Sequence, residues 1–225
     1  EIDLSGIGFQ NEWSLIQFGR GRQSWGAGND IQLALSDNSI AYDYGMIGLD
    51  FGSIRSRYFH GWLERADSSN RYITAKGIEW ANRKNFIISL SEIIIYSGIN
   101  RPIDLGYLNP LAPHLEVELN NRQNMMIGTS SANAIWQISI DILYNNFLRL
   151  SGNIIIDEFI LDKIQKENGK ENGLGFSFRA AWTPINNNKI MTFFLSMIYV
   201  GTHTLKHDNG YNNFVQRGKP LGWIH

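Results

Sequence analysis

A repeated alternation of apolar and polar side chains constrains this chain more than any other feature. In residues 136–144 every second position is apolar, with Trp136 and Tyr144 at the two ends and isoleucines between them. The pattern recurs in three later runs, at residues 148–157, 174–183 and 191–199. Because successive side chains of a β-strand point to opposite faces, each run predicts a strand with one apolar and one polar face.

The length and the ends of these runs favour strands that cross a membrane. About 9–11 residues form a tilted strand that spans a bilayer, whereas a spanning helix needs roughly 18 apolar residues, which no run reaches. Trp and Tyr are typical of the two membrane interfaces. Longer connections alternate with short ones, which fall near residues 11–12, 52–53, 82–85, 145–146 and 184–188. Ten strands fit between these links, and this rhythm predicts an all-β, antiparallel up-and-down transmembrane β-barrel.

Glu92 conflicts with a strand whose apolar face lies wholly in lipid. It falls on the same face as Leu90 and Ile94, where a lipid-exposed carboxylate would be costly. Two explanations remain open. Either a β-bulge shifts the register there, or this part of the face meets protein.

Charge and composition exclude several classes of function. The formal net charge of −1 gives no global attraction to nucleic acid. The absence of cysteine excludes disulfides, thiolate chemistry and Cys-ligated metals. Asp157 and Glu158 are neighbours on a strand, so they point to opposite faces and cannot flank one glycosidic bond. His203 and His207 lie where a strand runs into a loop, which favours a solvated pair over a metal site. We therefore expect no enzyme activity, no cofactor and no metal.

Two sets of residues are candidates for binding. The polar faces of the strands would line the barrel lumen, and the candidates are Arg55, Arg57, Gln137, Asp141, Arg149, Asn153, Asp157 and Arg179. Their arginines suit uronate carboxylates and sugar hydroxyls, or structural ion pairs within a filled lumen. The glycine-rich stretch 19–38 and the residues after it supply the candidates for glycan contact, which are Arg20, Arg22, Trp25, Asp37, Asn38, Tyr42 and Asp43.

Short motifs then follow one another along nearly the whole chain. They lie at residues 19–20, 25–28, 33–38, 92 with 96–98, 107–110, 155–158 and 217–222. Together they resemble the capsule assembly Wzi family. The resemblance implies a large monomeric β-barrel in the bacterial outer membrane that behaves like a lectin and helps to hold capsular or exopolysaccharide at the cell surface. Its partners would be that polysaccharide and outer-membrane lipid.

The chain also departs from the family. It has room for fewer spanning strands, it lacks the N-terminal helical part and the aromatic C-terminal residue, and Asn153 stands where the family often has Glu. We therefore expect residues 1–225 to form one β-barrel domain, truncated at both ends and part of a larger barrel.

Two other classes of function stay open. A porin would use the same polar faces to line an open channel for small polar or anionic solutes. A secreted β-sandwich lectin or glycan-active enzyme would cover the apolar faces with a second sheet instead of lipid.

Overall fold

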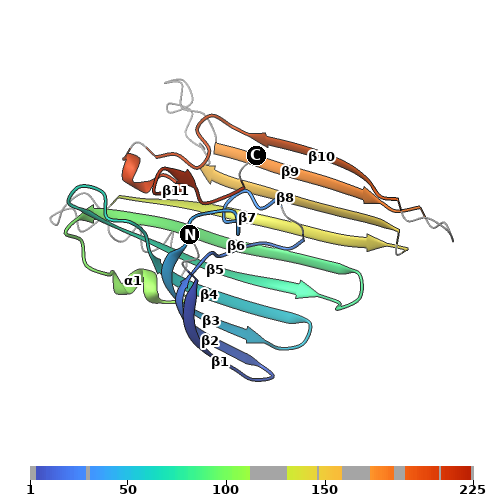
Figure 1. The fold of residues 1–225 in the computed structure, drawn as a ribbon, viewed down its shortest axis with the longest axis horizontal. Coiled ribbons are helices and arrows are strands. Elements are labelled where there is room, and N and C mark those ends of the chain that lie inside the picture. The colour runs from blue at the N-terminus through green and yellow to red at the C-terminus, as the bar shows by residue number, and fades with distance from the viewer. Residues whose placement is uncertain are drawn as a thin grey trace.

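One ten-stranded antiparallel sheet dominates the structure, which is a computed structural model (Figure 1). It describes residues 4–28, 31–111, 131–145, 147–158, 173–184, 191–207 and 209–223. Each strand pairs with the next along the chain, which confirms the predicted up-and-down arrangement of ten strands. In order they are β1 (Ser5–Gln10), β2 (Ser14–Gly21), β3 (Tyr42–Asp50), β4 (Ile54–Trp62), β5 (Ser69–Ala81), β6 (Phe86–Ile99), β7 (Ser131–Tyr144), β8 (Leu148–Glu158), β9 (Gly173–Trp182) and β10 (Phe193–Val200).

The connections alternate as the sequence predicts, except that the link after β4 (residues 63–68) is shorter than the link after β9 (residues 183–192). At one end of the sheet the links after β1, β3, β5 and β7 are short, and at the other end the links after β2, β6 and β8 are long. Asparagine side chains build two of the short turns. Asn11 Oδ1 accepts hydrogen bonds from the backbone N–H groups of Trp13 and Ser14, and Asn82 Oδ1 accepts three from residues 84–86. Such side chains satisfy the backbone of a tight turn, which fixes the register of the hairpin.

The sheet is open. Within the described residues β1 pairs with β2 alone and β10 with β9 alone, so these strands are the two edges (Figure 1). Closure into a barrel and insertion into a membrane therefore stay predictions. No helix of the described ranges is long and apolar enough to cross a membrane.

The register sorts the side chains onto two faces. We call the face that carries Gln137 and Ser139 the inner face, and the face that carries Trp136 and Ile138 the outer face. Seven of the eight predicted lumen-lining residues share the inner face, because the pairings that run from β4 through β9 keep them in phase. The eighth, Asp157, stands at a register shift between β8 and β9. These seven residues lie on one polar face, and their role as lining of a lumen, which would require closure of the sheet, stays a prediction.

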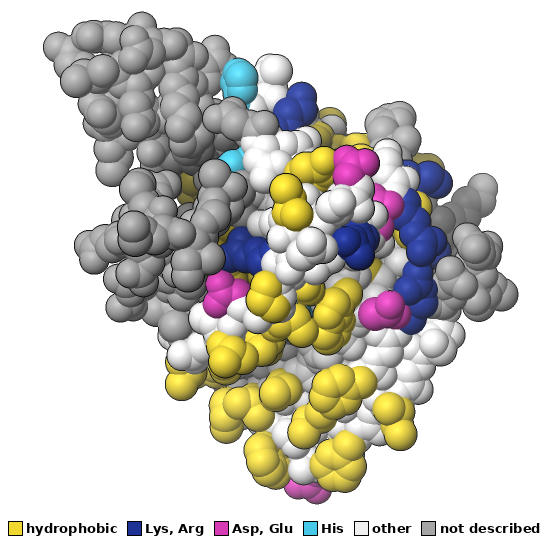
Figure 2. Space-filling view, turned by 90° about the vertical axis from the view of Figure 1, so that its left-hand side faces the viewer, with side chains coloured by type: hydrophobic (Ala, Val, Ile, Leu, Met, Phe, Trp, Pro, Cys, Tyr) yellow, Lys and Arg dark blue, Asp and Glu magenta, His cyan; other side chains and the backbone are white. Residues whose placement is uncertain are grey.

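The outer face exposes a band of large apolar side chains. Ile78, Leu90, Ile138 and Ile154 lie side by side in the register on β5 to β8, and all are exposed. At the ends of the strands near the short turns, aromatic rings pair on this face. The ring centroids of Trp80 and Phe86 are 5.3 Å apart, and those of Trp182 and Phe193 are 5.5 Å apart. Hydrophobic side chains also gather in the lower part of Figure 2, on the side of the first strands.

Protein covers part of the outer face at the end with the long connections. The short helix α1 (Leu105–Leu108) brings the Tyr107 ring onto Tyr96, with centroids 4.3 Å apart and an interplanar angle of 15°. The Tyr107 carbonyl accepts a hydrogen bond from the Tyr58 hydroxyl at 3.0 Å. The exposed apolar band of the outer face therefore does not extend to the end with the long connections, where α1 covers the sheet.

Glu92 lies next to this covered region and is buried. Its carboxylate is 3.1 Å from Lys76 Nζ on the neighbouring strand. The pairings of β6 with β5 and β7 run without a register shift, so no bulge explains its position. The second explanation holds instead: Glu92 is paired and covered by protein.

Candidate functional site

Between β2 and β3 the described residues, 22–28 and 31–41, fold back across the inner face of the sheet. In Figure 1 this dark-blue segment passes in front of the middle strands. Gln137 Nε2 donates to the Trp25 carbonyl at 2.7 Å, and Asn153 Nδ2 and Ser177 Oγ both donate to the Ile31 carbonyl at 3.2 Å. The polar side chains of β7, β8 and β9 thus satisfy the backbone of this segment, as buried polar groups require.

Two glycines let the segment approach the sheet closely. Gly26 has φ +126°, and a Cβ there would lie 2.3 Å from Gln137 Nε2. Gly28 has φ +97°, and its Cβ would lie 3.1 Å from the Cβ of Asp141. Both conformations are rare for residues with a side chain. The glycine-rich stretch is therefore fitted to the inner face.

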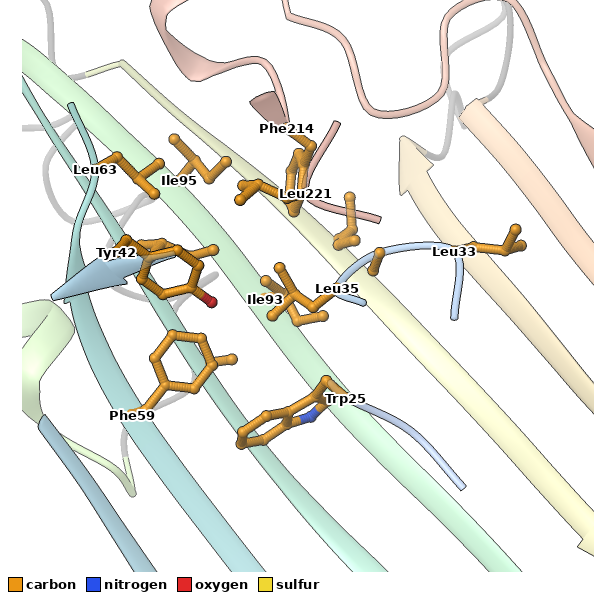
Figure 3. Close-up of a cluster of buried hydrophobic side chains, with 14 of the residues drawn as sticks. Trp25, Leu33, Leu35, Tyr42, Phe59, Leu63, Ile93, Ile95, Phe214 and Leu221 are labelled. Carbon is orange, nitrogen blue, oxygen red and sulfur yellow. The ribbon is translucent and has the colours of Figure 1, made fainter. Parts of the chain in front are cut away.

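Apolar side chains of the segment form a buried cluster with residues of the inner face. Trp25 packs against Phe59 with ring centroids 5.3 Å apart, and Leu33 and Leu35 join the same buried cluster (Figure 3). The Arg57 guanidinium lies over the Trp25 ring, 4.7 Å from its centroid. Cation–π contact of this kind holds the arginine against the segment.

The last part of the chain adds a second layer. Phe214 and Leu221 enter the same cluster (Figure 3), and the Leu221 carbonyl accepts a hydrogen bond from Ser36 N–H at 2.8 Å. This part holds η1 (Gly210–Asn212), β11 (Val215–Gln216) and β12 (Lys219–Pro220). Segments far apart in the sequence thus close over the inner face together.

Arg71 on β5 ties this C-terminal part to the sheet, although no local sequence signal marks it. Its Nε donates to the Tyr211 carbonyl at 2.6 Å, and its Nη2 donates to the carbonyls of Asn213 and Val215. Nearby, the Asp67 carboxylate accepts a hydrogen bond from the Tyr211 hydroxyl at 2.6 Å and raises the pKa of that hydroxyl.

The seven residues predicted to contact glycan do not form one site. Trp25 and Tyr42 are only 2% and 1% exposed, so neither ring offers a face on which a sugar could stack, and this part of the prediction is wrong. Both rings belong to the apolar cluster that the inner face and residues 22–41 form together. Arg20 and Asp43 are cross-strand partners on the outer face, with a 3.1 Å ion pair.

Three of the predicted residues lie together and are accessible. Arg22, Asp37 and Asn38 are exposed at the end of the sheet with the long connections. Arg22 Nη1 donates to the Asp37 carbonyl at 3.3 Å. This leaves the Asp37 carboxylate and the Asn38 amide at the surface, where such groups suit sugar hydroxyls. We call these three residues the surface triad.

The inner-face candidates pair with one another or with the covering segment. Arg149 forms a bidentate ion pair with Asp141, in which Nη2 and Oδ2 are 2.6 Å apart, and Arg55 pairs with Glu79. Asp157 accepts a hydrogen bond from Leu205 N–H, and Arg179 lies over the Phe194 ring at 4.6 Å. Of the two roles open to these residues, structural pairing describes their contacts on the open sheet.

In the described part of the chain, no group of three or more His, Asp or Glu side chains is arranged to hold a metal ion. Comparisons with family models, with curated proteins and with solved structures each gave no match.

Proposed function

We propose that this chain forms part of the wall of a bacterial outer-membrane β-barrel, which binds surface polysaccharide and helps to attach or assemble it at the cell surface without chemical turnover. The observation that carries the proposal is the contrast between the two faces. The outer face exposes Leu90, Ile138 and Ile154, whereas the described residues between β2 and β3 pack against the inner face. An exposed apolar face of this extent needs a nonpolar neighbour, and in a barrel that neighbour is lipid.

The filled inner face favours binding over transport. A porin needs an open, water-filled interior. Here Gln137 and Asn153 donate to the backbone of the segment that covers them. Trp25 and Leu35, which belong to that segment, are buried in the apolar cluster. A barrel with such an interior would expose its binding groups at the end with the long connections, where the surface triad lies.

Replacing the surface triad tests this function. We expect Arg22→Ala, Asp37→Ala and Asn38→Ala together to lower the affinity for isolated surface polysaccharide by at least about tenfold, since each lost hydrogen bond contributes roughly 0.5–1.5 kcal/mol. The measurement is binding of the purified protein to immobilised polysaccharide, together with retention of polysaccharide on cells.

The matched control is Glu12→Ala, because Glu12 is exposed in the short turn after β1, at the opposite end of the sheet. Its affinity should equal that of the unaltered protein. Unchanged binding by the triple variant would rule out the surface triad as the binding site.

A further inference from the structure

A basic cavity lies on the inner face at the end with the short turns, away from the surface triad. Its volume is about 580 Å³, and it lies among the ends of the strands from β3 to β8. Its charged lining residues are Asp50, Arg55, Arg83, Lys84, Asp141 and Arg149. Four cations from three neighbouring hairpins therefore surround one space.

The carboxylates that pair with these arginines are less exposed than the arginines themselves. The exposed fractions of the side chains are 45% for Arg55 against 15% for Glu79, and 50% for Arg149 against 9% for Asp141. Arg83 is 59% exposed, against 36% for its partner Asp50. The guanidinium groups are thus more exposed than the carboxylates that hold them, and four cations against two carboxylates line the cavity.

Arg55 and Arg83 keep donors for a ligand. Arg83 Nε donates to the Gly52 carbonyl at 2.7 Å and its Nη2 to Asp50 at 2.5 Å, which uses one edge of the guanidinium. Arg55 donates to Glu79 through Nη2. A guanidinium carries five N–H donors in a planar fork that matches the oxygens of a carboxylate or phosphate. Lys84 is exposed in the turn between β5 and β6, and no carboxylate of the described residues forms an ion pair with it.

We propose that this cavity binds a small polyanion that carries two or more carboxylate or phosphate groups. Held guanidinium groups are already oriented, so a ligand need not order them on binding. The cavity is much larger than a single phosphate, and its cations come from separate turns, which suits an anion with more than one charged group. The proposal does not depend on glycan binding at the surface triad.

The test is isothermal titration calorimetry of the refolded protein at low salt, with citrate in one experiment and pyrophosphate in the other. We expect at least one of them to bind. Two probes are used because they distinguish a carboxylate ligand from a phosphate ligand. Arg83→Gln with Lys84→Gln should weaken that binding by about tenfold or more, since hydrogen bonds to charged groups are the strong ones. Added salt should weaken it too.

Two single variants separate binding from folding. Lys84→Gln alone removes a charge that has no ion-pair partner among the described residues, so it should weaken binding without lowering stability. Arg65→Gln removes a cation at the opposite end of the sheet, where Arg65 donates to Asn100, and should leave binding unchanged. The proposal is overturned if neither anion binds, or if the Arg83/Lys84 variant binds as tightly as the unaltered protein.

Discussion

Ile138→Arg is expected to lower the free energy of unfolding in lipid vesicles by about 2–4 kcal/mol, which is the cost of a cation on the lipid face near the bilayer midplane. Ile138 is exposed near the middle of β7, between Leu90 on β6 and Ile154 on β8. In water the same change would replace one exposed side chain by another, at a cost within about 0.5 kcal/mol. Reversible unfolding by denaturant in vesicles measures the difference.

Ile54→Arg is the matched control for this prediction. Ile54 is also exposed on the outer face, but it is the first residue of β4, at the end with the short turns. A cation near a membrane interface costs only about 0–1 kcal/mol. Equal small effects of both substitutions would indicate that water or another sheet, rather than lipid, covers the outer face.

Gly26→Ala is expected to destabilise the protein by about 2–6 kcal/mol, because backbone strain and overpacking each contribute roughly 1–3 kcal/mol. The residue has φ +126°, and an added Cβ would lie 2.3 Å from Gln137 Nε2 and 2.5 Å from Gln32 Oε1. Nothing around it can yield without breaking hydrogen bonds that hold residues 22–41 to the sheet. Denaturant unfolding followed by tryptophan fluorescence measures the loss.

Gly52→Ala separates the two contributions. Gly52 also has a positive φ, of +85°, but nothing lies within 4 Å of its added Cβ. It should therefore show only the backbone cost. If Gly26→Ala were no more destabilising than Gly52→Ala, residues 22–41 would not be packed against the inner face as described.

The strands could be predicted from sequence because the signal is local. The alternation between Trp136 and Tyr144 sets both the element and its two faces, and the ten strands pair in the predicted order. The same period of two places seven of the eight predicted lumen-lining residues on the inner face. Each of these inferences needs only neighbours along the chain.

The covering of the sheet could not be predicted, because it depends on contacts between distant residues. Trp25 lies among glycines, and its sequence neighbours do not distinguish an exposed ring that binds a ligand from a buried ring that packs on Phe59. The alternation places Glu92 on an apolar face, and its ion-pair partner Lys76 lies on the neighbouring strand, which the alternation does not identify. Arg71 gave no signal at all, since its three carbonyl partners lie more than a hundred residues further along the chain.

The most direct test of the central proposal, that the outer face meets lipid, is tryptophan fluorescence in vesicles whose acyl chains carry bromine. Trp62, Trp80, Trp136 and Trp182 are exposed on the outer face, whereas Trp25 is buried on the inner face. We predict strong quenching relative to ordinary vesicles, with residual emission from buried tryptophan. Equal emission in both kinds of vesicle, from a protein that stays folded and soluble without lipid, would contradict a place in the membrane.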